Sequence, residues 1–162
     1  MDPEDSPIEI AIDCSAWQTA IPQIESVVRS AVAVACAQQG GAKGSVVVLL
    51  ADDTMVRDLN RRFRGKDKAT NVLSFPAVRL PAGGPEQPLG DLALAFETMK
   101  AEAESAGITL SHHLSHLLVH GTLHLLGHTH ENDADEARMM AMERAALAKL
   151  GVPDPYAKED AA

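Results

Sequence analysis

The sequence contains few cysteines, few aromatic residues and no long apolar run, and each shortage excludes a class of protein. Cys14 and Cys36 are the two cysteines among 162 residues and lack the spacing of a metal-binding pair, so we expect reduced, partly buried thiols. Aromatic residues make up 3% of the chain, so aliphatic side chains must build the core. No apolar segment approaches the length of a membrane span, and the acidic, proline-containing start is unlike a signal or transit peptide. We therefore predict a cytoplasmic protein that does not engage a membrane.

Positive charge is also scarce, and it is unevenly distributed. The chain has 14 lysine and arginine residues against 23 acidic ones, a net charge of −9, which argues against nonspecific coating of nucleic acid. Residues 57–68, which we call the basic segment, nevertheless carry six of the positive side chains: Arg57, Arg61, Arg62, Arg64, Lys66 and Lys68. This segment is either a solvated helix face or a surface that meets phosphates.

The alternation of strand-like and helix-like patterns predicts an α/β protein of the α+β-like kind. We expect one domain over residues 1–162, with flexible ends at 1–7 and 156–162. Its sheet should be small and mixed, with about four strands packed against about five helices. Strands are predicted at 8–13, 45–50, 69–76 and from residue 91, and helices at 22–40, 52–64, 97–107, 109–127 and 132–151.

The stretch "HGTLHLLGHTH", residues 120–130, has the spacing of a metal site at the end of the helix predicted at 109–127. His120 and His124 lie four residues apart and therefore share one face of a helix. Gly127 can end that helix in a left-handed turn, so that His130 supplies a third nitrogen. Three imidazoles leave a tetrahedral ion with one open position, which is typical of catalytic zinc. We predict one Zn²⁺ ion, although other transition metals also accept imidazole ligands.

Residues around the histidine motif limit the reactions that the site could catalyse. His112, His113 and His116 precede the motif and are expected at the surface or around the site, with His116 at its edge. Zinc peptidases of the His-Glu-x-x-His type place a glutamate after the first histidine as general base. This chain has Gly121 there, which has no group to accept a proton. The sequence therefore disfavours that peptidase mechanism.

Three segments together resemble the YbeY family of bacterial endoribonucleases, which take part in ribosomal RNA maturation. "HGTLHLLGHTH" is similar to the family pattern His-Gly-x-Leu-His-Leu-x-Gly-(Tyr/Phe)-Asp-His, "LNRRFRGKDKATNVLSFP" (59–76) matches a second pattern, and "LGDL" (89–92) a third. The resemblance implies one metal ion, usually zinc, on His120, His124 and His130, and a catalytic role for Arg64 in RNA cleavage. The chain departs from the family at His128 and Thr129, where Tyr/Phe-Asp is usual.

The resemblance implies a single-strand-type, metal-dependent endoribonuclease for ribosomal RNA processing and ribosome quality control. Its partners would be ribosomal RNA or its precursors, and ribosomal or ribosome-associated proteins. Two alternatives stay open: a metallohydrolase of another class, such as a peptidase or amidase, and a non-catalytic ribosome-assembly factor. Arg64 also has an alternative role, a salt bridge to Asp67 or Asp91.

Overall fold

The computed structural model describes residues 8–38, 44–78 and 87–157. Of the two ends predicted to be flexible, residues 1–7 and 158–162 lie outside these ranges. The strands of the described chain are β1 (Ile8–Ile12), β2 (Val46–Ala51), β3 (Val72–Pro76) and β4 (Gly90–Ala95). Its helices are α1 (Ala16–Ala20), α2 (Ile24–Ala37), α3 (Asp53–Arg64), α4 (Phe96–Ala106), α5 (Leu110–Leu125) and α6 (Asp133–Lys149).

The four strands form one mixed sheet in the order β1-β2-β4-β3. β1 pairs with β2 and β2 with β4 in parallel, whereas β3 runs antiparallel to β4. The parallel pairs need crossover connections, which α2 and α3 provide, while β3 and β4 follow one another directly. The predicted α/β class and mixed sheet are confirmed.

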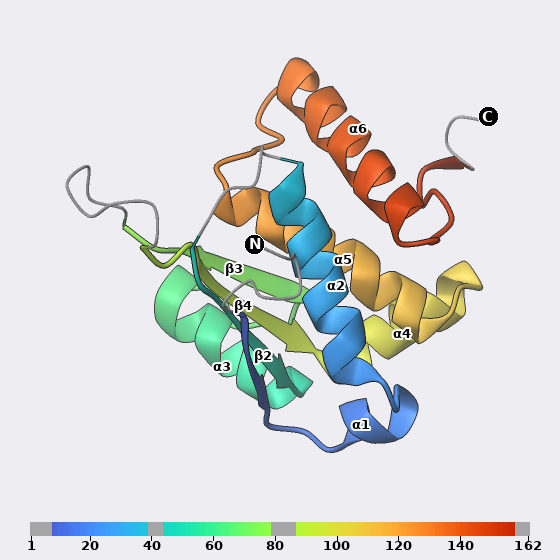
Figure 1. Cartoon of the computed structure of the whole chain (residues 1–162). Helices are drawn as coiled ribbons and strands as arrows, with labels where there is room; N and C mark the ends of the chain where they lie inside the picture. Colours follow the sequence, from blue (N-terminus) through green and yellow to red (C-terminus); the bar gives the residue numbers. More distant parts are fainter. Residues whose placement is uncertain (1–7, 39–43, 79–86, 158–162) are drawn as a thin grey trace.

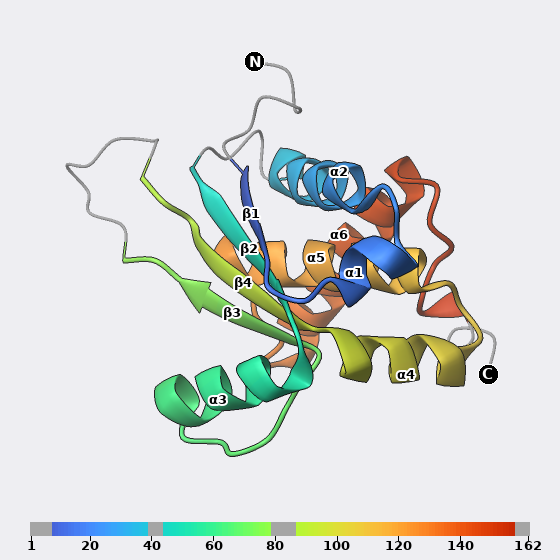
Figure 2. The same ribbon diagram turned by 90° about the horizontal axis from the view of Figure 1, so that it is seen from below.

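Helices cover the two faces of the sheet unequally (Figure 2). α2 and α5 lie against one face with α6 outside them, and α3 lies on the other (Figures 1 and 2). Alternate residues of β2, such as Val48 and Leu50, belong to the larger core under α2 and α5. A smaller cluster around Val56 and Leu73 joins α3 to the opposite face. The larger core holds the long helix that carries the histidine motif.

Local sequence explains where α3 begins and ends. The Asp52 side chain accepts a hydrogen bond from the Met55 amide at 2.8 Å, which caps the start of the helix. Gly65 follows the last residue, Arg64, with a left-handed φ of 69°, a conformation that favours glycine. The chain therefore turns sharply after Arg64, and that side chain projects from the end of the helix.

Gly121 lets α5 approach the sheet closely. A Cβ atom at this position would lie 2.8 Å from a methyl group of the buried Leu92 on β4 and 3.3 Å from the Ser74 hydroxyl on β3. A larger side chain would require Leu92, or α5 itself, to shift. The residue that removes the peptidase base thus also allows this close approach.

The short helix α1 was not predicted by the sequence pattern. Its Trp17 is fully buried, and the indole N–H donates a 2.9 Å hydrogen bond to the carbonyl of Ala51. Across the described residues, no helix combines the length and the apolar composition that crossing a bilayer requires.

Candidate active site

The three histidines predicted to bind metal lie next to one another at the end of α5. The ring centroids of His120 and His124 are 4.7 Å apart, those of His124 and His130 5.2 Å, and those of His120 and His130 6.0 Å. Gly127, with φ of 98°, makes the turn that brings His130 back toward the helix. The structure therefore assembles the three side chains by the route that the spacing predicts.

The two imidazole nitrogens contributed by α5 are about as far apart as two ligands of one metal ion. His120 Nε2 and His124 Nε2 are 3.2 Å apart. Zinc–nitrogen bonds are about 2.0–2.1 Å long, so two nitrogens on a tetrahedral ion are about 3.3–3.4 Å apart. As the side chains are placed within residues 8–38, 44–78 and 87–157, no group of three histidine, cysteine or acidic residues forms a metal site. His130 is the exposed member of the trio.

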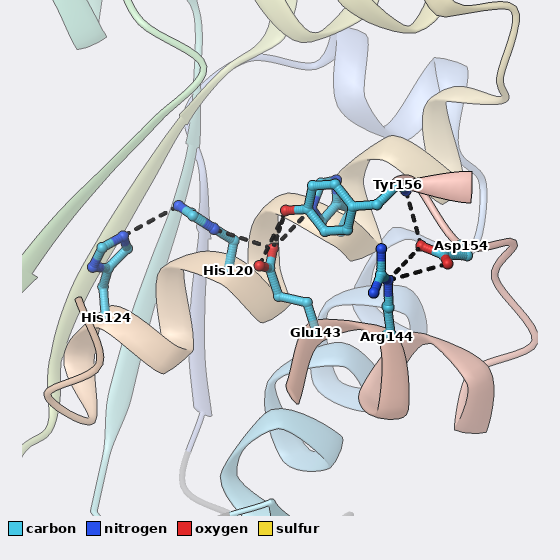
Figure 3. A network of polar contacts seen from close by, with 7 residues as sticks. His120, His124, Glu143, Arg144, Asp154 and Tyr156 are labelled. Atoms are coloured by element: carbon cyan, nitrogen blue, oxygen red, sulfur yellow. Dashed lines mark hydrogen bonds and ion pairs between the residues drawn. The ribbon is translucent and has the colours of Figure 1, made fainter. Parts of the chain in front are cut away.

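A buried carboxylate lies behind the histidines (Figure 3). Glu143 of α6 is 1% exposed and contacts His116 Nε2 at 2.8 Å and His120 Nδ1 at 3.1 Å through the same oxygen. The Tyr156 hydroxyl donates to both carboxylate oxygens at 3.1 Å. Because its Nδ1 faces Glu143, His120 turns Nε2 toward His124.

The environment sets the charge of two of these groups. Burial by itself would raise the pKa of the Glu143 carboxyl, but hydrogen bonds from His116 and His120 outweigh burial and lower that pKa to about 2. Burial, together with the neighbouring His120 and His130 rings, lowers the pKa of His124 to about 4. His124 is therefore neutral at pH 7 and has the lone pair that a metal ligand needs.

Arg64 lines the same cavity as the three histidines, with a volume of about 720 Å³. Its guanidinium donates to the backbone carbonyl of Ser74 and lies 5.4 Å from the centre of the Phe75 ring, both on β3. The lining also includes residues of α5 and the following turn, among them His120, His124 and His130. Arg64 and the three rings thus line one opening although His120 lies 56 positions after Arg64 in the chain.

The remaining arginines of the basic segment pair with acids on the exposed surface. Arg57 Nε contacts Asp67 at 2.8 Å, and Arg61 and Arg62 contact Asp58 at 2.7 and 3.7 Å. Asp67, one of the two acids considered above for Arg64, pairs with Arg57 instead. Among the described residues, no ion pair joins Arg64 to Asp91, the other. Because these side chains are exposed to solvent, the pairs contribute little to stability.

Thr129 stands where the resembling family usually has aspartate. Its hydroxyl donates to the carboxylate of Asp135 at 3.2 Å, and the Asn132 side chain donates to the same oxygen at 3.1 Å. Thr129 also lines the cavity. A carboxylate therefore lies one hydrogen bond behind this position.

Sequence reasoning missed Glu143 and Tyr156. Glu143 lies in the middle of a helix with many acidic residues, and nothing in its spacing separates it from solvated neighbours. Tyr156 falls in the segment predicted to be flexible, yet its ring packs edge-on against His116 with centroids 5.6 Å apart. The one available signal was an expectation that His116 reaches the edge of the site.

The chain is similar in sequence to a known protein family. The sequence model described as "Endoribonuclease YbeY" matches residues 11–151. A protein of that name from Rhodopseudomonas palustris is 47% identical, covering 94% of this chain and 82% of its own length. A namesake from Azorhizobium caulinodans is 46% identical, covering 93% of this chain and 96% of the relative.

A solved structure shares the fold. The solution structure of a Thermotoga maritima protein aligns with a TM-score of 0.55 over 88% of this chain and 91% of that one, at 21% identity. This likeness concerns the arrangement of strands and helices.

Proposed function

The chain belongs to the Endoribonuclease YbeY family, and on that premise we propose that it is a metal-dependent endoribonuclease that processes ribosomal RNA or its precursors. The observation that carries the proposal is the meeting of three imidazole rings and one arginine around a single cavity. We further propose that residues 1–162 act as one domain, in the cytoplasm, with ribosome-associated proteins guiding the acidic chain to its RNA.

His120, His124 and His130 would hold the metal, which we propose is Zn²⁺. Neutral imidazole is a preferred zinc ligand, and the low pKa of His124 keeps that ring neutral. A bound cation at this position supplies Lewis acidity toward a phosphoryl oxygen. The three side chains would fix the position of the ion, since two are on α5 and the third follows the Gly127 turn.

Arg64, which lines the same cavity, would bind the scissile phosphate. Its guanidinium presents a planar set of donors and stays protonated at every physiological pH. The Ser74 carbonyl and the Phe75 ring orient the group without neutralising its charge. The arginine is therefore placed to stabilise negative charge that builds on phosphoryl oxygens during cleavage.

The rest of the basic segment would contact the RNA backbone. Arg61, Arg62, Lys66 and Lys68 are exposed and lie next to Arg64 in the chain. Contacts of this kind give affinity that falls steeply with salt concentration and carries little sequence information.

The peptidase alternative loses support from packing as well as from chemistry. A glutamate at position 121 would have to fit where even a Cβ atom meets Leu92 at 2.8 Å.

The decisive experiment pairs His124→Ala with His112→Ala, a histidine on the same helix outside the cavity lining. Protein purified without added metal is examined by elemental analysis and by cleavage of a ribosomal RNA precursor, with and without chelator. We expect wild type and His112→Ala to hold one ion and cleave, and His124→Ala to lose both. Cleavage by metal-free protein, or by His124→Ala, would refute the proposal.

A further inference from the structure

Glu143 is exceptional among the residues that the structure describes, because it is their one charged side chain in the fully buried class. Burying a carboxylate is unfavourable unless hydrogen bonds replace the lost water. Three side chains provide them: His116, His120 and Tyr156. The carboxylate thus joins α5, α6 and the segment that follows α6 (Figure 3).

The contact with His120 determines which nitrogen of that ring carries hydrogen. A carboxylate only accepts hydrogen bonds, so the Nδ1 atom that faces Glu143 at 3.1 Å must be the protonated one. A neutral imidazole has one N–H, so Nε2 of His120 keeps its lone pair. That atom is the one 3.2 Å from His124 Nε2, on the side of the cavity.

Tyr156 keeps the carboxylate in place. Its hydroxyl reaches both oxygens at 3.1 Å. The segment that carries it is anchored again by Asp154, which accepts from the Tyr156 amide at 2.8 Å and pairs with Arg144 of α6 at 3.2 Å. Residues after α6 are therefore held against Glu143 and His116.

We propose that Glu143 and Tyr156 are positioning residues for metal binding: they hold His120 in the Nδ1–H form with Nε2 directed at the ion. The inference rests on the proposed metal site at His120, His124 and His130. It adds a requirement that the ligand motif does not contain, since α6 and residues 151–157 must be docked before the site has its full affinity.

The first test uses metal-free wild-type protein at pH 7.5. Long-range ¹H–¹⁵N NMR distinguishes the two neutral forms of each histidine. We expect His120 in the Nδ1–H form, and the Nε2–H form would overturn the inference. This measurement needs no variant and no activity.

The second test measures Zn²⁺ affinity by competition with a chromophoric chelator. Glu143→Gln keeps the shape but removes the charge and one acceptor, and should raise the Zn²⁺ Kd about 10–100-fold. Tyr156→Phe removes one donor and should have a smaller effect in the same direction. Thr122→Val is the matched control, because Thr122 is buried on α5 but bonds to the Leu118 carbonyl, and its Kd should not change.

The outcomes distinguish a failure of the proposed metal site from a failure of the positioning role of Glu143 and Tyr156. Wild-type protein that fails to bind Zn²⁺ removes the proposed metal site and the inference with it. Tight binding that is equal in wild type, Glu143→Gln and Tyr156→Phe overturns the inference alone. Should Glu143→Gln fail to fold, Tyr156→Phe and the wild-type NMR spectrum decide.

Discussion

Two carboxylates in this protein each face two basic side chains, and they do so in opposite surroundings. Glu143 lies between α5 and α6, 1% exposed, with His116 and His120 as partners. Asp58 lies on the surface of α3, with a side chain 39% exposed, and faces Arg61 and Arg62. The buried carboxylate has one permitted geometry, whereas the exposed one shares its partners with water. Burial therefore lets Glu143 fix the orientation of its histidine partners, whereas Asp58 can exchange its arginine partners for water.

Arg64 links the two regions, because it belongs to the exposed helix α3 but lines the cavity with the histidines. We expect Arg64→Ala to lower the rate of RNA cleavage about 10²–10³-fold, the usual effect of removing a donor to transition-state charge. Single-turnover cleavage assays measure the rate, and elemental analysis should show unchanged metal content. Arg57→Ala on the same helix is the control, and an equal loss of rate there would mean that α3 acts through charge alone.

Glu143→Ala measures the buried half of the comparison. Removing the acceptor leaves the ring N–H groups of His116 and His120 without their partner, so the free energy of unfolding should fall by about 1–3 kcal/mol. Urea denaturation in the presence of chelator isolates this effect from metal binding. A loss no larger than that of Asp58→Ala would show that the network contributes no more than a surface pair.

Lys66 and Lys68 test the role of the exposed surface in RNA binding rather than in stability. Replacing both with Gln should reduce the dependence of log K on log[salt] by about 0.7 for each lost phosphate contact on single-stranded RNA. Fluorescence anisotropy over a salt series gives the slope. An unchanged slope would place the RNA elsewhere on the molecule.

Asp58→Ala should have the smallest effect. Exposed ion pairs contribute about 0–1 kcal/mol, so the change in unfolding free energy should stay below about 1 kcal/mol. Thermal or urea unfolding measures it against Glu143→Ala under the same conditions. A cost above that of Glu143→Ala would reverse the comparison.

The sequence predicts those elements that show an apolar periodicity or a helix-capping residue. The apolar alternation of Ile8–Ile12 and the Asp52 cap of α3 each give a local signal, and the elements form where these signals stand. Helix α1 has five residues, too few for a period, and Trp17 is buried because it meets Ala51 across the chain. β3 begins at Val72, later than the predicted residue 69, because pairing with Leu94 of β4 sets its first residue.

The site divides in the same way. The spacing of His120, His124 and Gly127 is local, and the rings gather as that spacing predicts. Glu143 and Tyr156 reach the site from 23 and 36 residues beyond His120, through the docking of α6 and the segment after it. No short-range pattern encodes such an approach, so contacts of this kind emerge only with the assembled structure.

The order of the side chains along the polypeptide has a consequence for protein synthesis. A ribosome makes the arginine of α3 first, the histidine helix next, and Glu143 and Tyr156 after both. Until α6 and residues 151–157 have emerged and packed, His120 has no carboxylate to orient it. During synthesis the three histidines are therefore present before the side chains that hold His120 in position.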